Sequence, residues 1–503
     1  MPHLGASLPP PGLDDTLRRP LSTISVSEPG ARRRRRAAGS VPHPSVEERA
    51  ARGKEARARA PRATHAAWEP PSERRAPVDV LLDQAAGRVT ELLPIRHGRM
   101  LASPFAFFRG GAAVMAADLA GTPQSGVPVQ LCGDAHLSNF GGFAAPDREL
   151  VFDINDFDET ARGPWEWDVK RLAASIAIAG RKLGLPPATR CATVEAAVRS
   201  YREALRRFAS MRNLDLWYAR LDVARILAHV RDRVSREERR AFKRRVASAY
   251  AKDHLRAMSK LTQRVDGTLR IVSRPPLIVP IEELFPAAIG EATEERMRSV
   301  LRGYRRTLPA DRRHLLEGYR YRHMARRVGG VGSVGTRTWI VLLTGRDGDD
   351  PLFLQVKQAG PSVLDAYVGQ SAIRNHGQRV VEGQRLMQAA SDIFLGWLRT
   401  TWADDSARDF YVRQLWDWKI SAEVEMMSPA RLNVYGTLCG WTLARAHARS
   451  GDRIAIAAYL GSGKAFDRAI AAFAETYADQ NERDHAALEA AARAGRIAAE
   501  HGV

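Results

Sequence analysis

The chain has 503 residues, 45% of them hydrophobic, which is enough for a large core divided over roughly two to four structural units. Its formal net charge of +20 attracts polyanions such as nucleic acids, nucleotides and anionic membranes, although much of the excess lies near the N-terminus. Three cysteines without C-x-x-C pairing or metal-ligand spacing argue against a disulfide framework and a zinc site, and no stretch approaches the ~20 apolar residues that span a bilayer. We therefore expect a cytoplasmic protein that does not contact membranes.

The first 77 residues are rich in Pro, Ser, Ala and Arg and show no sustained apolar period. Such a composition does not bury enough apolar surface to fold, so residues 1–77 are expected to form a disordered, basic tail. The run Arg32–Arg36 has two interpretations. It makes a weak nucleic-acid contact, or it is a solvated part of the tail, and the second interpretation is the simpler one.

Ordered structure is expected to begin near Val78. Apolar residues first recur at helical spacing, two short apolar runs then have the pattern of strands, and a long helical pattern follows. These elements are a helix at 78–92, strands at 128–134 and 150–156, a helix at 169–184 and further helices over about 188–265. Prolines within 268–310 break any long element there.

The pattern changes near residue 328. Two runs rich in β-branched and aromatic residues flank an Asp-Gly turn, which predicts an antiparallel hairpin. The elements expected in this part are strands at 336–343, 352–357 and 409–419, and helices at 378–391, 430–449 and 464–496.

The segment GDAHLSN follows the first expected strand and contains Asp134 and Asn139, five residues apart. This is the spacing of the kinase catalytic loop. In such a loop the Asp accepts or orients the proton of an attacking hydroxyl, while the Asn oxygen reaches a magnesium ion on the phosphates. A short irregular loop aims both side chains into one cleft, which predicts phosphoryl transfer with Asp134 as the base.

Asp156 and Asp158 follow the next expected strand. Magnesium prefers hard oxygen ligands, and phosphoryl transfer depends on positioning and charge neutralisation more than on covalent chemistry. A metal site formed by Asn139, Asp156 and Asp158 is therefore expected. Asp153 and Asp158 crowd the same segment, and each is either an extra ligand or a turn residue that bonds its own backbone.

The motifs GDAHLSN, NDFD and GPWEWDVKRLA resemble the catalytic core of aminoglycoside phosphotransferase and choline kinase-type enzymes, which are kinase-like. Residues 78–490 also resemble a bacterial family described as domain of unknown function 2252, with the hallmarks SPFAFFRG, GDAHLSNFG, NDFDET, GPWEWDVKRLAAS and LARAHARSGD. This resemblance implies that Asp134 is the catalytic base and that Asn139 and Asp156 are metal ligands. It also implies that Asp168 is a structural acid that holds the loop. It supplies no substrate.

Gly330, Gly332 and Gly335 form a G-x-G-x-x-G match. A dinucleotide-binding fold would place a helix after the third glycine. The run that follows here is β-branched and has the pattern of a strand, which favours the kinase arrangement of a hairpin whose tip covers phosphates. These glycines are therefore expected to bind a nucleotide such as ATP.

Lys357 lies in the second strand of the expected hairpin, where a lysine grips phosphates in kinases. Glu382 lies in the helical segment that follows and is expected to hold this lysine by an ion pair. Gln384 and Glu425 are rivals for the second role.

The order of these parts is unusual for a kinase. A nucleotide lobe of five strands and one helix needs roughly 60 residues, yet only about 55 separate Val78 from the catalytic loop, and these lack a strand pattern. We therefore expect an α+β, protein-kinase-like, two-lobed fold in circularly permuted order, with a large helical C-lobe-like part and a small antiparallel β nucleotide lobe. The expected parts are the tail 1–77, a catalytic-loop and helical part 78–320, the nucleotide lobe 321–425 and C-terminal helices 426–503.

Four other polar residues are candidates for supporting roles. Arg109 follows an aromatic cluster and either contacts phosphate or substrate or pairs with a core acid. His447 and Asp452 lie at a helix end and either line the acceptor pocket or serve only local capping and pairing. His136 is expected to brace the catalytic loop rather than to transfer protons.

The pattern as a whole favours an ATP-dependent phosphotransferase that uses Mg²⁺ and acts on a small molecule or a protein. One alternative is nucleotidyl transfer in the same cleft, and another is a nucleotide-binding pseudokinase. A third is a metal-dependent phosphoesterase, with ligands from Asp134-x-His136 and from the carboxylates at 153, 156 and 158. The sequence names neither the acceptor nor the oligomeric state.

Overall fold

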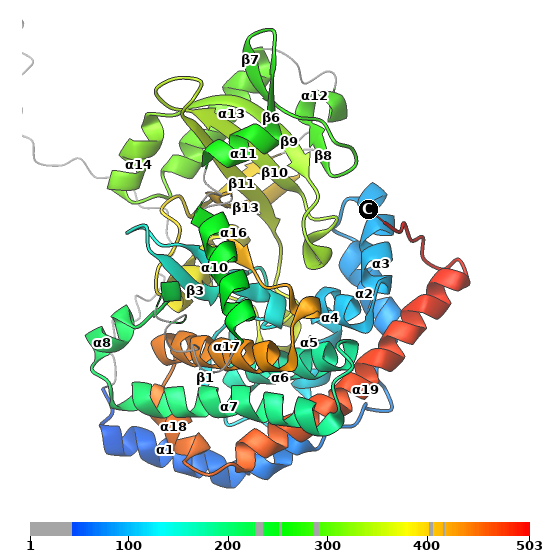
Figure 1. Cartoon of the computed structure of the whole chain (residues 1–503), viewed down its shortest axis with the longest axis vertical. Coiled ribbons are helices and arrows are strands. Elements are labelled where there is room, and N and C mark those ends of the chain that lie inside the picture. Colours follow the sequence, from blue (N-terminus) through cyan, green and yellow to red (C-terminus); the bar gives the residue numbers. More distant parts are fainter. Residues whose placement is uncertain are drawn as a thin grey trace, which may run out of the picture. The chain divides into compact units, whose positions relative to one another are not determined.

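The computed structural model describes residues 43–224, 226, 235–250, 254–285, 291–401, 406–415 and 418–502. The described helices and strands lie in the compact unit Ser45–Val503, which is a mixed α+β structure with antiparallel sheets (Figure 1). The run Arg32–Arg36 lies outside the described residues. Within the described ranges, no helix is both long and apolar enough to cross a membrane.

Val46–Arg59 forms helix α1, in a region expected to be a disordered tail. Ser45 caps this helix, because its hydroxyl accepts a hydrogen bond from the backbone N–H of Glu48 (3.1 Å) while the Glu48 carboxylate accepts one from the backbone N–H of Ser45 (2.6 Å). The helix packs against α18 (Arg453–Leu460) near the other end of the chain. The prediction of disorder is therefore wrong for residues 45–77, where a cap and a distant partner outweigh the composition.

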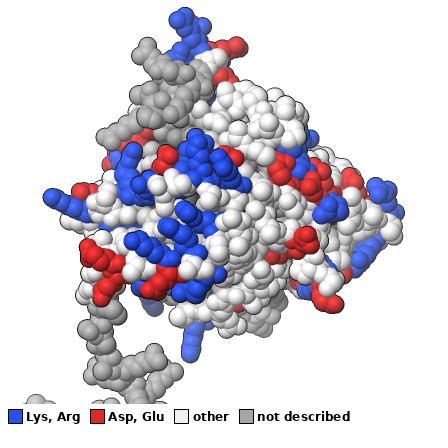
Figure 2. Space-filling model, turned by 90° about the horizontal axis from the view of Figure 1, so that it is seen from below, with Lys and Arg blue, Asp and Glu red and all other residues white. Residues whose placement is uncertain are grey.

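The largest core surrounds helix α6 (Trp165–Lys182), which is buried along almost its whole length. Helices α7 (Pro187–Ser210), α17 (Pro429–Ser450) and α19 (Ala465–Arg493) lie around it in the lower half of Figure 1. Shorter helices of this part are α2 (Pro77–Ala85), α3 (Leu93–Leu101), α4 (Pro104–Gly110), α5 (Ala112–Ala120) and α8 (Asn213–Tyr218). The face below these helices carries groups of Lys and Arg with fewer Asp and Glu (Figure 2).

Lys170 on α6 is a buried cation whose ammonium has no hydrogen-bond partner among the described residues and lies 4.9 Å from the ring centroid of Phe473. Burial lowers the pKa of Lys170 to about 7, and the nearby Glu166 opposes this shift in part. Between pH 7 and about 10 the unfolded chain therefore binds a proton that the folded protein has lost, so this group makes stability rise with pH in that window.

Lys170→Met is expected to remove this contribution. Relative to the variant, the wild-type protein should gain up to ~2.5 kcal/mol of unfolding free energy between pH 7 and pH 9, because its buried amine is then neutral. Thermal or denaturant unfolding of both proteins at the two pH values measures the gap. A gap that does not change with pH would contradict the expectation.

A six-stranded antiparallel sheet with the order β12-β13-β11-β10-β9-β8 forms the other large part. Its strands are β8 (Ile278–Pro280), β9 (Arg320–Arg327), β10 (Thr338–Thr344), β11 (Pro351–Ala359), β12 (Gly396–Thr401) and β13 (Ala407–Gln414). The predicted hairpin is confirmed by the pairing of β10 with β11. The strand predicted at 409–419 ends at Gln414, and β12 was not predicted.

The two faces of this sheet are covered by different helices. On β10, the side chains of Val341 and Leu343 join one apolar cluster, whereas those of Ile340 and Leu342 join another, as the two-residue period of a strand requires. Covering helices are α11 (His254–Leu261) and α13 (Glu291–Arg305), and α16 (His376–Met387) packs against β12 and β13.

The segment between the two large parts holds short elements. They are α10 (Arg236–Tyr250), β6 (Thr262–Val265), β7 (Thr268–Ile271), α12 (Ile281–Leu284) and α14 (Ala310–Glu317). Strands β6 and β7 form a hairpin in a region expected to be helical up to about residue 265. Asp266 and Gly267 at its tip have φ values of 49° and 76°, so the Asp-Gly pair is the turn signal that could have predicted it.

A small sheet with the order β14-β2-β3-β5 lies next to the helical core. Its strands are β2 (Phe140–Ala144), β3 (Leu150–Ile154), β5 (Leu221–Asp222) and β14 (Ile420–Ser421), and β1 (Pro128–Leu131) pairs with β4 (Ala161–Pro164) beside it. Asp134 lies in the connection from β1 to β2, and Asp156 lies in the connection from β3 to β4. Both acidic loops therefore emerge from the same small region.

Candidate active site

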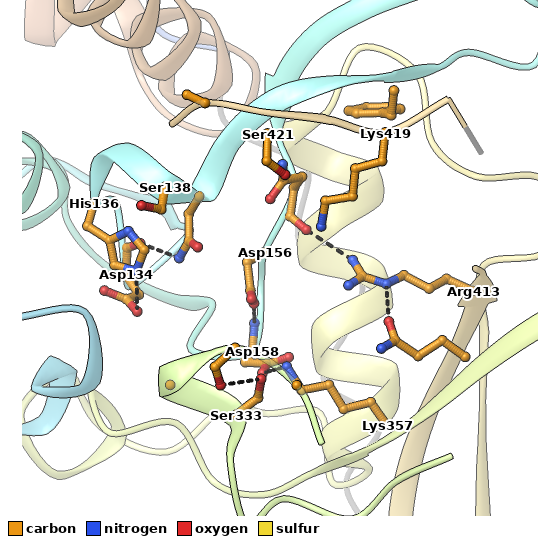
Figure 3. Close-up of a pocket in the computed structure, with 18 of the residues that line it drawn as sticks. Asp134, His136, Ser138, Asp156, Asp158, Ser333, Lys357, Arg413, Lys419 and Ser421 are labelled. Atoms are coloured by element: carbon orange, nitrogen blue, oxygen red, sulfur yellow. Dashed lines mark hydrogen bonds and ion pairs between the residues drawn. The ribbon is translucent and has the colours of Figure 1, made fainter. Parts of the chain in front are cut away.

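A cavity of about 870 Å³ is lined on one side by the loops that follow β1 and β3 and on the other by the β9–β10 loop, β11 and β13. Figure 3 shows side chains from both sides pointing into it. Of the residues singled out in the sequence, the cavity collects Arg109, Asp134, His136, Asn139, Asp156, Asp158, Gly330, Gly332 and Lys357. Those that do not line it are Asp168, Gly335, Glu382, His447 and Asp452.

Asp168, in the first turn of α6, holds the loop that carries Asp134. Its carboxylate accepts hydrogen bonds from the backbone N–H groups of Cys132 (2.9 Å) and Gly133 (3.1 Å). Gly133 has a φ of 85°, and a Cβ there would lie 2.1 Å from the carbonyl oxygen of Glu159, so this turn requires glycine. The path of the loop is therefore closely defined.

His447 is buried in the core behind the loop. One of its ring nitrogens lies 3.2 Å from a carboxylate oxygen of Asp168, and the other lies 2.9 Å from the hydroxyl of Tyr201. Asp452 caps α18, because its carboxylate accepts a hydrogen bond from the backbone N–H of Ala455 (3.0 Å). The suggestion that His447 and Asp452 line an acceptor pocket is therefore wrong, and the local interpretation applies to both.

Asp134 is held by the cation of Arg171, whose Nε donates a hydrogen bond of 2.8 Å to one carboxylate oxygen. Burial raises the pKa of Asp134, and Arg171 opposes this shift. The Nε2 atom of His136 lies 3.5 Å from the other carboxylate oxygen, and burial followed by the charges of Arg171 and Arg109 lowers the pKa of this histidine well below its usual value. A neutral His136 therefore lies against a buried carboxylate that is a stronger proton acceptor than an exposed one.

Asn139 and Asp156 supply oxygen atoms that suit a magnesium ion. The amide nitrogen of Asn139 donates a hydrogen bond to the backbone carbonyl of Asp134 (2.9 Å), which leaves the amide oxygen for a cation. Burial raises the pKa of Asp156, and the neighbouring Asp158 raises it further, so a bound cation would stabilise its charged form. Mg²⁺ is commonly held by one or two protein carboxylates together with substrate phosphates, and this donor set fits that mode. The described ranges contain no group of three or more His, Cys, Asp or Glu that could hold a metal by itself.

Asp158 is bound to protein groups. One of its carboxylate oxygens forms an ion pair with Lys357, and the other accepts a hydrogen bond from the hydroxyl of Tyr411 (2.8 Å). Burial by itself would raise the pKa of Asp158, but Lys357 and Tyr411 bring it below its usual value. The structure thus gives Asp158 a pairing role where the sequence suggested a metal ligand.

Glu382 does not pair with Lys357. It lies on the exposed side of α16, where its carboxylate accepts a hydrogen bond from the amide of Gln378 (2.6 Å). The rival Gln384 lies on the cavity side of the same helix. The predicted Lys357–Glu382 pair is wrong because α16 is rotated so that Glu382 faces away, and Asp158 takes its place as the partner of the lysine.

The glycine-rich loop joins β9 to β10 and contains a short 3-10 turn at Val331–Ser333. Gly330 and Gly332 line the cavity, and so does Ser333. Gly335 has a φ of 84° and faces away from the cavity, so its glycine serves the turn rather than a ligand. Two of the three predicted glycines are therefore placed to approach a nucleotide.

Arg88 holds this loop from the outside. Its guanidinium donates hydrogen bonds to the carbonyl oxygens of Gly332 (3.0 Å) and Val334 (2.6 Å). The backbone N–H of Val89 donates another to the carbonyl of Gly335 (2.8 Å). The segment that precedes the catalytic loop in the chain therefore fixes the position of the glycine-rich loop.

Arg109, in the last turn of α4, faces the cavity near Asp134 and Glu425. Its Nε has no hydrogen-bond partner among the described residues. Burial lowers the pKa of Arg109, and the charges of Glu425 and Asp134 oppose this shift. Because it forms no core ion pair in the described structure, Arg109 is placed to contact an anionic group in the cavity.

Three charged residues of the cavity were missed in the sequence: Glu159, Arg413 and Lys419. Burial raises the pKa of Glu159 to about 7, which is in the range useful for proton transfer. Arg413 lies two residues after Tyr411 on β13, and therefore on the same face of the strand. Since Tyr411 pairs with Lys357 across the sheet, this two-residue period was a signal that could have indicated Arg413.

A comparison with protein-family models finds one match, which covers residues 88–491 and is described as an uncharacterized protein conserved in bacteria (DUF2252). Neither a curated protein nor a solved structure matches the chain. The match covers well over half of the chain, including every residue that lines the cavity except Gln84.

Proposed function

Since the chain belongs to the DUF2252 family, whose name assigns no reaction, we propose from the cavity itself that it is an ATP-dependent phosphotransferase with a kinase-like fold in circularly permuted order. One observation carries this proposal. Asp134, Asn139 and Asp156 line the same cavity as the glycine-rich loop and Lys357, which lie about two hundred residues later in the chain. Chance motifs would have no reason to meet in one cavity.

The strand order supports the kinase-like part of the proposal. Strands β9 and β10 flank the glycine-rich loop, β11 carries Lys357, and α16 precedes β12 and β13. A kinase nucleotide lobe has a glycine-rich loop, a strand lysine and then a helix in the same sequence. Here this lobe follows the catalytic loop in the chain, and the lysine partner comes from Asp158 instead of the helix.

In this mechanism the glycine-rich loop and Lys357 hold the phosphates of ATP. Asp134 accepts the proton of an acceptor hydroxyl while the hydroxyl oxygen forms a bond to the γ-phosphorus. The bond between that phosphorus and the bridging oxygen breaks, and ADP leaves. A magnesium ion held by Asn139 and Asp156 would neutralise charge on the phosphate oxygens.

The phosphoesterase alternative is less well supported. It needs several free carboxylates around two metals. Asp153 is buried beneath the cavity in an ion pair with Arg445 (2.6 Å), and Asp158 is paired with Lys357. Two of the carboxylates that this alternative requires are therefore already bound to cations of the protein. Nucleotidyl transfer, a nucleotide-binding pseudokinase, a small-molecule or protein acceptor and a cytoplasmic location remain parts of the proposal for experiments to decide.

Incubation of the purified protein and a cell extract with ATP and Mg²⁺, using label at either the α- or the γ-phosphate, tests the function. Transfer of γ-label to a protein or small molecule, with release of ADP, is the expected result. Transfer of α-label with release of pyrophosphate would indicate nucleotidyl transfer instead. Binding of ATP without any transfer would indicate a pseudokinase, and failure to bind ATP would overturn the proposal.

A further inference from the structure

Arg413 and Lys419 lie on the side of Asp156 that is remote from Asp134, where Figure 3 shows both side chains directed into the cavity. Arg413 is near the end of β13, and Lys419 immediately precedes β14. The chain between them passes from the six-stranded sheet to the small sheet. The two cations therefore stand where the two sheets come together around the cavity.

The charges near Asp156 do not balance. Lys357 is paired with Asp158, so neither of these two residues is left to neutralise another. Arg413 donates hydrogen bonds to two neutral acceptors, the side-chain oxygen of Gln355 (2.9 Å) and the backbone carbonyl of Asn155 (3.0 Å). Its positive charge is thus oriented without being neutralised.

Lys419 has no hydrogen-bond or ion-pair partner among the described residues, although its side chain is partly buried. Burial lowers the pKa of Lys419 to about 8, the positive charge of Arg413 lowers it further, and Asp156 opposes the shift. A partly buried cation without a partner destabilises the folded protein. Its position is explained by an anion that enters the cavity.

We propose that Arg413 and Lys419 form an anion subsite that holds the phosphate chain of the donor on the far side of Lys357 from Asp134. The inference rests on the proposed function and deepens it by assigning two further donor-binding residues. With the reacting phosphate at Asp134, the rest of the chain runs past Asp156 and Lys357 toward this subsite. The ligand class is a linear polyphosphate ester, and charge-assisted hydrogen bonds are the source of its recognition.

Inorganic tripolyphosphate is the probe for this subsite, because it has the phosphate chain of ATP without the nucleoside. Lys419→Met is expected to weaken tripolyphosphate and ATP binding by about 10- to 100-fold in calorimetric titrations with Mg²⁺. The melting temperature should stay the same or rise, because the variant removes a cation that has no partner in the protein. Lys419→Arg, which keeps the charge, should retain most of the affinity.

Lys464→Met is the matched control, since Lys464 is exposed at the start of α19 and does not line the cavity. It should bind tripolyphosphate as the wild-type protein does. Arg413→Gln should weaken binding in the same way as Lys419→Met, with circular dichroism to check that the loss of its two structural hydrogen bonds leaves the fold intact.

The outcomes separate this subsite from the proposed function. Wild-type protein that binds ATP, together with a Lys419→Met variant that binds tripolyphosphate equally well, would overturn the subsite and leave the phosphotransferase proposal standing. A variant that loses affinity for ATP but not for tripolyphosphate would also overturn it, because Lys419 would then contact the nucleoside. Tripolyphosphate binding that depends on Lys419, without any transfer from ATP, would support the subsite and contradict the function.

Discussion

Asp134→Asn is expected to lower the rate of transfer from ATP by about 10²- to 10⁴-fold while the protein still binds ATP and Mg²⁺. The amide keeps the size of the side chain and can still accept a hydrogen bond from Arg171, but it cannot take the proton of an acceptor hydroxyl. ATP binding depends on the glycine-rich loop, Lys357 and Asp156, which the substitution leaves in place. Turnover with labelled ATP and calorimetric titration of ATP measure the two effects separately.

Asp147→Asn serves as the control for this variant. Asp147 is an exposed acid in the connection between β2 and β3, where it pairs with Arg220 (2.7 Å) outside the cavity. The same chemical change there should alter neither turnover nor ATP affinity. If Asp134→Asn kept wild-type turnover, Asp134 would not be the base, and Glu159 would become the next carboxylate to test.

Lys357→Met is expected to weaken ATP binding by about 10- to 100-fold, because it removes a charge-assisted contact to the phosphates. The variant also breaks the buried ion pair with Asp158, whose carboxylate keeps only its hydrogen bond to Tyr411. Since Asp158 is partly exposed, we expect a loss of about 1–3 kcal/mol of unfolding free energy. Titration with ATP gives the first effect, and denaturant unfolding gives the second.

The double variant Lys357→Met with Asp158→Asn separates binding from stability. It removes the unpaired carboxylate, so most of the lost unfolding free energy should return. ATP affinity should stay low, because the lysine itself is still missing. Wild-type ATP affinity in either variant would show that Lys357 does not hold the nucleotide, and restored affinity in the double variant alone would assign the effect to Asp158.

The sequence predicted the local features of this fold well. Strands β10 and β11 follow from their β-branched runs and the Asp-Gly turn, and the loop of Asp134 and Asn139 follows from a short motif. In both cases the neighbouring residues in the chain determine the structure. Helix α1 was missed because its stability comes from packing on α18, although Ser45 and Glu48 have the spacing of a capping box.

The pairings across the cavity could not be predicted in the same way. Glu382 and Gln384 are two residues apart on α16, and which of them faces the cavity depends on how the helix is rotated against the sheet. The lysine on β11 could have met either of several acids, and distance along the chain gave no reason to choose Asp158. Lys419 lay in an expected strand that in fact ends earlier, so its direction was not defined by a strand period.

The ion pair between Lys357 and Asp158 also has a consequence for biosynthesis. Its two members are 199 residues apart, and at roughly 5–20 residues per second a ribosome needs about 10–40 s to make that stretch. During this interval the nascent chain carries the acidic loops without the lysine that neutralises one of them and without β14, which completes the small sheet. A nucleotide site of this design is therefore assembled only late in translation, so the growing chain has no means to capture ATP prematurely.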